Sequence, residues 1–130
     1  MEDLYIKGKT GRSPLVDFKA TGELLLEGRS ICEDPLEFYT PVIDWVKALK
    51  ENPPKSIILK IQLDFFNTAS SKILIHLFSI FDSIHKKGNE VKIIWYYNSG
   101  DEEILQAGMD YESLIDVPFT LVEISQDGNQ

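Results

Sequence analysis

The chain has 130 residues, of which 43% are hydrophobic, and a formal net charge of −8 at pH 7. This length suffices for one well-filled core but not for two ordinary domains, so we expect a single domain over residues 1–130 with an ordered core from about residue 4 to residue 124. Because the acidic surface would repel nucleic-acid phosphates and anionic lipids, the charge argues against both as partners.

Three features favour a cytoplasmic protein. No apolar run approaches the ~20 residues that are needed to cross a bilayer, so we expect no membrane span. The start Met1-Glu2-Asp3-Leu4 lacks the basic residues and the apolar stretch of a secretory signal. Cys32 is the single cysteine, which rules out an internal disulfide and agrees with a reducing compartment.

The N-terminal part of the chain predicts antiparallel strands. Leu4-Tyr5-Ile6 is a short apolar stretch before a polar, glycine-containing loop. Residues 15–18 and 23–27 are rich in apolar side chains, and Lys19-Ala20-Thr21-Gly22 between them has the composition of a tight turn. We therefore expect a short first strand followed by a β-hairpin.

A helix is predicted to begin after Asp34. This residue type caps helices, the proline after it suits the first helical position, and Glu37 places an acid in the first turn. Apolar side chains then recur at helical spacing until Asn52-Pro53-Pro54 ends the pattern. Because Pro41 lacks a backbone N–H, we expect the helix either to kink there or to restart with Thr40 as its cap.

The centre of the chain predicts a buried strand that leads into a long helix. Residues 56–63 are apolar and β-branched and follow two prolines. Beyond a polar stretch, apolar side chains recur at helical spacing with polar ones on the opposite side. The apolar positions are Ile73, Leu74, Leu77, Ile80, Phe81 and Ile84. Lys86-Lys87-Gly88 ends this helix.

The C-terminal part predicts two further strands with a helix between them. Residues 90–97 are rich in β-branched and aromatic side chains, and we expect at least one ring of Trp95-Tyr96-Tyr97 in the core. Acids at 101–103 mark the start of a helix, and residues 111–115 are compatible with a further helical turn. Residues 118–124 alternate in polarity as a strand does, and we expect a frayed tail at 125–130. The alternation of strands and helices predicts a mixed α/β sheet with N-terminal antiparallel strands and three to four helices mainly on one face.

Polar side chains gather where the central strand meets its helix. Asn67, Thr68, Ser70 and Ser71, followed by Lys72, would lie at a helix N-terminus, where backbone N–H groups lack partners and the helix dipole favours negative charge. One interpretation is that Asn67 or Thr68 simply caps the helix. The other is that a hydroxyl of this cluster accepts a phosphate, which would add about −1.5 to −2 charges. The two roles are compatible.

No other residues predict a catalytic, metal or cofactor site. His76 and His85 have no second histidine or cysteine at ligand spacing, so we expect solvated side chains and no bound metal. Asp101-Glu102-Glu103 fits the charge preference of a helix N-terminus, and Asp110 fits a polar surface. A hydrolase would require these carboxylates to converge in a pocket. Cys32 has no basic or histidine neighbour in the sequence that would activate its thiol.

Several motifs together resemble the SiaC family of bacterial regulatory phosphoproteins, from about Leu4 to Ile124. They are Gly28-Arg29-Ser30, Glu33-Asp34-Pro35, residues 38–45, residues 65–72 and Trp95-Tyr96-Tyr97. The most specific is Asn67-Thr68-Ala69-Ser70-Ser71-Lys72. This resemblance implies a fold like that of anti-sigma-factor antagonists (STAS domains), in which the phosphorylated hydroxyl also follows a strand and opens a helix.

The resemblance also implies a function. The family's phosphorylated threonine falls on Thr68, surrounded by Asn67 and Lys72, with Ser70 and Ser71 as further candidate acceptors. Three partners are implied: a serine/threonine kinase, a PP2C-type phosphatase, and a diguanylate cyclase that the unphosphorylated form binds and activates. Cyclic-di-GMP signalling and biofilm formation would then follow the state of Thr68. We expect a non-enzymatic protein without cofactors, monomeric when free; the alternative is a partner-switching protein of the anti-sigma-factor-antagonist type.

Overall fold

A computed structural model describes residues 1–125 of the chain. Over this range six strands and three helices follow one another in the order β1 (Leu4–Ile6), β2 (Leu15–Phe18), β3 (Glu23–Ser30), α1 (Pro35–Glu51), β4 (Ser56–Phe66), α2 (Thr68–Lys86), β5 (Glu90–Asn98), α3 (Glu102–Glu112) and β6 (Phe119–Ile124). Each predicted strand and helix is present, although β4 continues beyond the predicted end and α3 ends at Glu112, within the segment 111–115 where a further turn was predicted. Of the tail predicted at 125–130, residues 126–130 lie outside the described residues. None of the described helices is long and apolar enough to cross a membrane.

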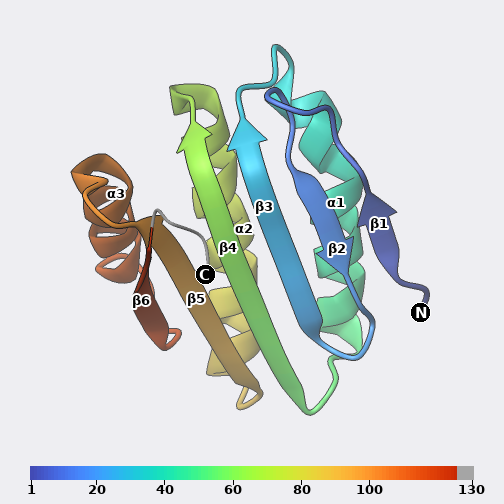
Figure 1. The fold of residues 1–130 in the computed structure, drawn as a ribbon. Coiled ribbons are helices and arrows are strands. Elements are labelled where there is room, and N and C mark those ends of the chain that lie inside the picture. The colour runs from blue at the N-terminus through green and yellow to red at the C-terminus, as the bar shows by residue number, and fades with distance from the viewer. Residues whose placement is uncertain (126–130) are drawn as a thin grey trace.

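All strands belong to one six-stranded sheet, in the order β1-β2-β3-β4-β5-β6. The first two pairs, β1 with β2 and β2 with β3, are antiparallel. The remaining three pairs are parallel, and each is connected through a helix. Consequently α1, α2 and α3 all begin beyond the carboxyl ends of strands, the edge that lies at the top of the view for β3 and β4 (Figure 1). This topology confirms the predicted mixed sheet.

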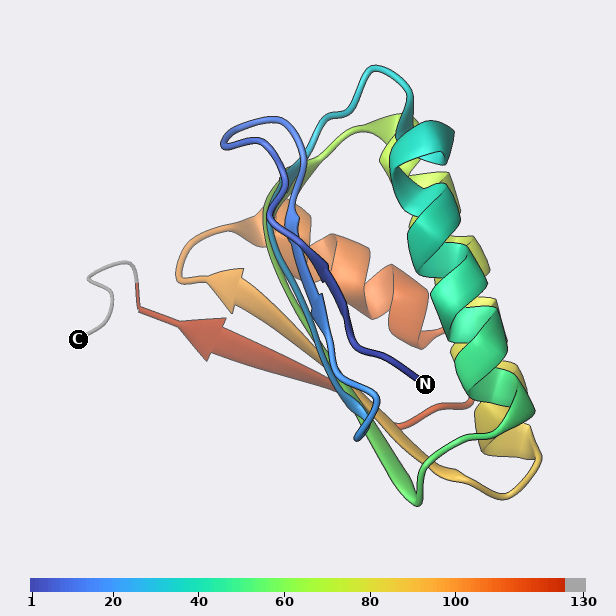
Figure 2. The same ribbon diagram turned by 90° about the vertical axis from the view of Figure 1, so that its right-hand side faces the viewer.

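The helices cover one face of the sheet, as Figure 2 shows from the side. On β4, Ile57, Leu59, Ile61 and Leu63 are buried, whereas the residues between them are half-buried or exposed. The other face of the sheet is turned towards the viewer in Figure 1 and carries no helix. Since only one face is covered, every second residue of a strand remains near water, which is why the sequence alternates in polarity.

An aromatic cluster joins α2 and α3 to the sheet. The ring of Tyr111 lies 5.0 Å from that of Phe78 and 5.4 Å from that of Trp95, which is fully buried. Phe66, the last residue of β4, packs edge-on against Trp95 at 5.9 Å. Gly108 lets α3 approach this cluster, because a Cβ atom there would lie 2.5 Å from Cδ1 of Trp95. The end of β4 and the start of α2 are therefore anchored in the core.

The restart of the helix with Thr40 as its cap, one of the two outcomes predicted at Pro41, does not occur. α1 is continuous from Pro35 to Glu51, and Asp34 rather than Thr40 is its cap. Pro41 lies on the exposed side of the helix, so the backbone carbonyl that its ring deprives of a partner can be hydrated. The hydroxyl of Thr40 adds a bond in the same turn by donating to the Leu36 carbonyl at 2.6 Å.

A carboxylate on α2 binds the loop that connects α3 to β6. The Asp82 carboxylate accepts the backbone N–H of Asp116 at 2.9 Å, and the ammonium of Lys86 lies 3.1 Å from Asp82 and 3.5 Å from Asp116. Burial opposes ionisation of Asp82, but the hydrogen bonds from Asp116, Lys86 and Val117 outweigh it and hold the pKa of this carboxyl below its ordinary value.

Candidate functional site

The turn between β4 and α2 is fixed by hydrogen bonds to Asn67. Its backbone is extended, and its side-chain oxygen accepts the N–H of Ser70 at 2.9 Å, so Asn67 is the N-cap of α2. The backbone N–H of Asn67 donates to the carbonyl of Ser30, at the end of the adjacent strand β3, at 3.0 Å. Thr68 is therefore not the cap but the first residue of the helix.

A β-bulge precedes this turn. Gly28 on β3 pairs with Leu63 and Arg29 pairs with Phe65, so Asp64 is the extra residue on β4. Gly28 has a φ of 120°, a backbone conformation that glycine adopts far more readily than other residues. After the bulge, Phe65 is 44% exposed with the Arg29 guanidinium 5.6 Å from its ring centre, while Phe66 turns into the core. The bulge thus changes which side chains face outward just before Thr68.

The structure separates the hydroxyl-bearing residues of the predicted cluster. Thr68 and Lys72 are exposed, and Thr68 has no side-chain hydrogen bond to any other residue in the range 1–125. Ser71 is half-buried and its hydroxyl donates to the Thr68 carbonyl at 2.6 Å. Ser70 is fully buried and its hydroxyl donates to the Ser30 carbonyl at 3.0 Å. Of the three hydroxyls, that of Thr68 is the most accessible to another protein.

The N-terminus of α2 differs in charge from those of the other two described helices. Asp34 caps α1 and Asp101 caps α3, and each of these helices has at least one acid in its first turn. α2 is capped by the neutral Asn67 and has no acid in its first turn. No carboxylate in the cap or the first turn of α2 therefore offsets the positive end of the helix dipole. An anion added at this end would be stabilised.

The carboxylates considered for a hydrolase do not all lie in one pocket. Asp101 accepts the N–H of Ile104 as the cap of α3, and Asp110 accepts the side-chain amide of Gln106. Asp101 and Glu103, but not Asp110, line a hollow of about 220 Å³ between the end of β4 and α3. Within residues 1–125 no group of three or more His, Cys, Asp and Glu side chains is placed to hold a metal ion. Burial raises the pKa of the Cys32 thiol, which keeps it protonated and poorly nucleophilic.

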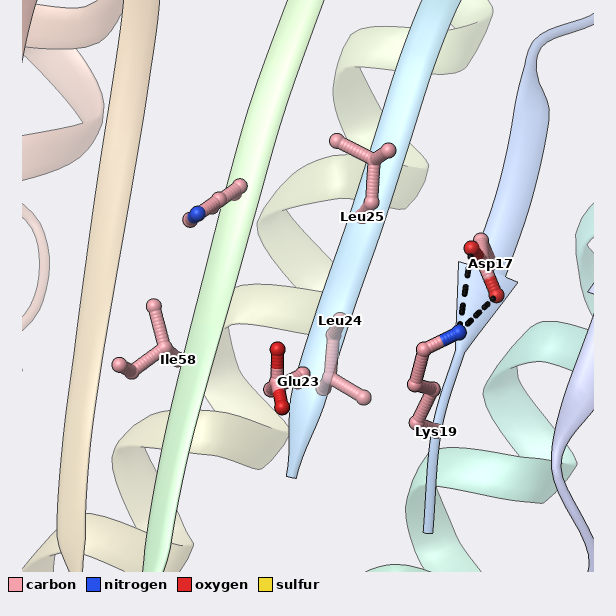
Figure 3. A pocket seen from close by; sticks show the side chains of 7 residues that line it. Asp17, Lys19, Glu23, Leu24, Leu25 and Ile58 are labelled. Carbon is pink, nitrogen blue, oxygen red and sulfur yellow. Dashed lines mark hydrogen bonds and ion pairs between the residues drawn. The ribbon is translucent and has the colours of Figure 1, made fainter. Parts of the chain in front are cut away.

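A second hollow, of about 280 Å³, lies on the open face of the sheet (Figure 3). Leu25 and Ile58 line it beside Glu23 and Lys60, and the ammonium of Lys19 pairs with Asp17 at 3.3 Å. These residues belong to the amino-terminal halves of β3 and β4 or to the hairpin before them. The hollow is therefore at the opposite end of the parallel strands from Thr68.

The comparison with protein families decides the identity of the chain. The model of the family described as "SiaC family regulatory phosphoprotein" matches residues 6–124. The chain belongs to the SiaC family. An uncharacterized protein of Pseudomonas aeruginosa (strain UCBPP-PA14) is 28% identical to it in an alignment over 123 residues that covers 93% of this chain and 96% of that protein.

Solved structures of SiaC from Pseudomonas aeruginosa have the same fold. One matches with a TM-score of 0.87 and 25% identity, covering 95% of this chain and all of that one. SiaC in a complex with the diguanylate cyclase SiaD, of which it is the activator, matches with a TM-score of 0.88 and 24% identity over 94% of this chain. Apo-SiaC matches with a TM-score of 0.84 and 23% identity. This SiaC-family chain thus has the SiaC fold over almost its whole length.

The sequence did not reveal which residues surround the start of α2 in this SiaC-family protein. Ser30 on β3 forms a hydrogen bond with Ser70, Tyr39 on α1 forms one with Ser30, and Tyr111 on α3 donates to the Ser71 carbonyl. Ser30 was part of the resemblance, but nothing in its sequence neighbourhood indicates a contact with a residue forty positions away. A glycine within a strand, Gly28, is the one local signal that pointed to irregular backbone near this edge.

Proposed function

We propose that this protein is a non-enzymatic regulatory phosphoprotein that is switched by reversible phosphorylation of Thr68. The observation that supports this most strongly is the position of Thr68: exposed, first in α2, and at a helix N-terminus without a carboxylate of its own. A phosphate on Thr68 would have both the free backbone N–H groups and the helix dipole in its favour. Membership of a family of regulatory phosphoproteins supports the same role.

The unphosphorylated form would bind and activate a diguanylate cyclase. The support is the activator role of Pseudomonas aeruginosa SiaC in its complex with the cyclase SiaD. In the present protein Thr68 and Ala69 are exposed, and so is the ring of Phe65 three residues before Thr68, so the unmodified surface suits contact with an apolar partner face. Phosphate would place a strongly hydrated dianion in that contact, and binding would be lost through desolvation and repulsion.

The remaining elements of the proposal follow from the same switch. A serine/threonine kinase would add the phosphate and a PP2C-type phosphatase would remove it, both in the cytoplasm. The whole chain, residues 1–130, would act as one switch domain, monomeric when free and without a cofactor. The output would be the level of cyclic-di-GMP and, through it, biofilm formation.

The test compares Thr68→Ala and Thr68→Asp with the unmodified protein. We expect the unmodified protein and Thr68→Ala to bind a diguanylate cyclase of the native host and to stimulate cyclic-di-GMP synthesis, and Thr68→Asp to bind at least about tenfold more weakly, a loss of about 1.4 kcal/mol. Ser79→Asp is the matched control, because Ser79 is exposed on the same helix. Equal binding by Thr68→Ala and Thr68→Asp would contradict the proposed mechanism.

Phosphorylation itself is tested by mass spectrometry. After incubation with ATP and lysate of the native host, the intact mass should increase by one phosphate, fragmentation should place it on Thr68, and Thr68→Ala should remain unmodified. No modification, under conditions in which a control kinase substrate is phosphorylated, would leave Thr68 as an ordinary first residue of a helix. Selective binding of an anti-sigma factor in place of a cyclase would favour the alternative partner-switching function.

A further inference from the structure

A chain of buried hydroxyl groups lies directly beneath the first turn of α2. Ser30 and Ser70 are each 0% exposed and are the buried polar residues in the described part of the chain. The Ser30 hydroxyl donates to the Ser70 hydroxyl at 2.8 Å, the Ser70 hydroxyl donates to the Ser30 carbonyl at 3.0 Å, and the hydroxyls of Ser30 and Tyr39 are 2.7 Å apart. Because the Ser30 hydroxyl donates its proton to Ser70, the Tyr39 hydroxyl is the donor in its hydrogen bond with Ser30.

This chain of bonds satisfies every hydroxyl proton. Tyr39 donates to Ser30, Ser30 to Ser70, and Ser70 to the Ser30 carbonyl. The same carbonyl also accepts the backbone N–H of Asn67, so both of its lone pairs are used. A buried polar network with all donors satisfied specifies one arrangement of its members, since any other arrangement would leave a buried group unpaired.

A second tyrosine holds the same helical turn from the other side. Tyr111 of α3 is 5% exposed, and its hydroxyl donates to the backbone carbonyl of Ser71 at 3.1 Å. Tyr39 lies on α1 and Tyr111 on α3. The first turn of α2 is thus bonded directly to α3 and, through Ser30 of β3, to α1, whereas the Thr68 side chain is left outside these contacts.

We propose that Tyr39 and Tyr111 are positioning residues of the phosphorylation site. Tyr39 acts through Ser30 on Ser70, and Tyr111 acts on the Ser71 carbonyl; together they keep Ser70 turned into the core and Thr68 turned outward. The two tyrosines therefore determine which hydroxyl of the cluster receives the phosphate. This inference rests on the proposed phosphorylation of the site.

Amide hydrogen exchange of Tyr39→Phe, Tyr111→Phe and the double variant tests the positioning without any partner. Each change removes one hydroxyl and keeps the ring, and Tyr39→Phe leaves the protons of Ser30 and Ser70 with their acceptors. The amides of Ser70 and Ser71 should exchange roughly fivefold faster in each single variant, because this factor corresponds to the net free energy of one hydrogen bond. The exchange rates of amides at the centre of β4 should remain unchanged. Tyr5→Phe, at an exposed tyrosine of β1, is the matched control. Exchange at wild-type rates in both single variants would overturn the proposal.

The choice of acceptor is tested by locating the phosphate after treatment with ATP and host lysate. We expect phosphate on Thr68 alone in the wild-type protein, and on Thr68, Ser70 and Ser71 in the double variant. Ile57→Val, which removes a buried methyl group at the amino-terminal end of β4, controls for lost stability and should retain Thr68 alone. Phosphate confined to Thr68 in the double variant would overturn the selecting role. If the wild-type protein takes no phosphate, the proposed function fails, and the exchange rates still decide whether the tyrosines hold the turn.

Discussion

Removal of the cap of α2 by Asn67→Ala should destabilise the protein by about 1 kcal/mol. The Asn67 oxygen accepts the N–H of Ser70 at 2.9 Å, a well-formed capping bond. Its amide nitrogen lies 3.5 Å from the Cys32 carbonyl, at the limit of a hydrogen bond, so this second contact adds little. For a domain of this size the loss corresponds to a fall in Tm of about 4 °C. With an m-value of about 2 kcal/mol/M, the urea midpoint should fall by about 0.5 M.

The caps of the other two helices provide matched controls. Asp34 and Asp101 each accept a backbone N–H at 3.1 Å from the residue three positions further on, as Asn67 does. Asp34→Ala and Asp101→Ala remove a capping bond and also a carboxylate that interacts with the helix dipole, worth about 0.3–1 kcal/mol at low salt. Because salt screens that interaction, their loss of stability should shrink in about 1 M salt, where the screening length is ~3 Å. The loss in Asn67→Ala should not change, since Asn67 is neutral.

The assay is urea unfolding of the wild-type protein and the three variants at low and high sodium chloride, followed by circular dichroism. Unfolding of Asn67→Ala at the wild-type midpoint would show that the capping bond contributes nothing. A loss in Asn67→Ala that shrinks with salt as much as the losses of the two aspartate variants would refute the electrostatic difference between α2 and the other helices. That difference underlies the suitability of this helix N-terminus for a phosphate.

Three further predictions concern the core and the titratable groups. Gly108→Ala should destabilise the protein by about 1–2 kcal/mol and alter its tryptophan fluorescence. The added Cβ would overlap with the Trp95 ring, and this overlap outweighs the better helix propensity of alanine. A variant with the fluorescence and stability of the wild-type protein would contradict this prediction. The pKa of Asp82 is lowered in the folded protein, so the ionised carboxylate stabilises the fold. This stabilisation is present above the ordinary carboxyl pKa of ~3.9 and is lost as the pH falls through the folded-state pKa. Between neutral pH and about pH 3, the urea midpoint of Asp82→Asn should therefore fall less steeply than that of the wild-type protein. Burial raises the pKa of Tyr111 to about 12, so its neutral hydroxyl should stabilise the fold fully below pH ~10, and this stabilisation should disappear as the pH rises through about 12. In Tyr111→Phe, the urea midpoint should therefore fall less steeply over this alkaline range than in the wild-type protein.

The elements of the fold could be predicted because their signals are local. Asp34 and the proline after it mark the start of α1, and the alternation of buried and exposed residues along β4 marks a sheet covered on one face. At Pro41 a local rule predicted either a kink or a restart of the helix, and the restart with Thr40 as its cap does not occur. The helix continues because that residue faces water and tertiary packing of the opposite side holds the helix together.

The candidate site was only partly predictable. The sequence placed Asn67, Thr68, Ser70 and Ser71 at the start of a helix, since a strand pattern, a polar run and a helical pattern follow one another there. It left open which residue is the cap and which hydroxyl is accessible. The structure makes Asn67 the cap, buries Ser70 and exposes Thr68.

The sequence by itself determined the strands, the helices, their order and the polar start of α2, because these depend on side-chain periodicity and on residues within one helical turn of each other. Only the tertiary structure decided that the Ser70 hydroxyl is buried and that the Ser71 carbonyl is held, because their partners, Ser30 for the Ser70 hydroxyl and Tyr111 for the Ser71 carbonyl, are each forty residues away in the chain. Such contacts form where α1, α2 and α3 begin or end beside the sheet. A local pattern can therefore identify the cluster, but long-range packing against the sheet and the other helices decides that Thr68 is exposed while Ser70 is buried.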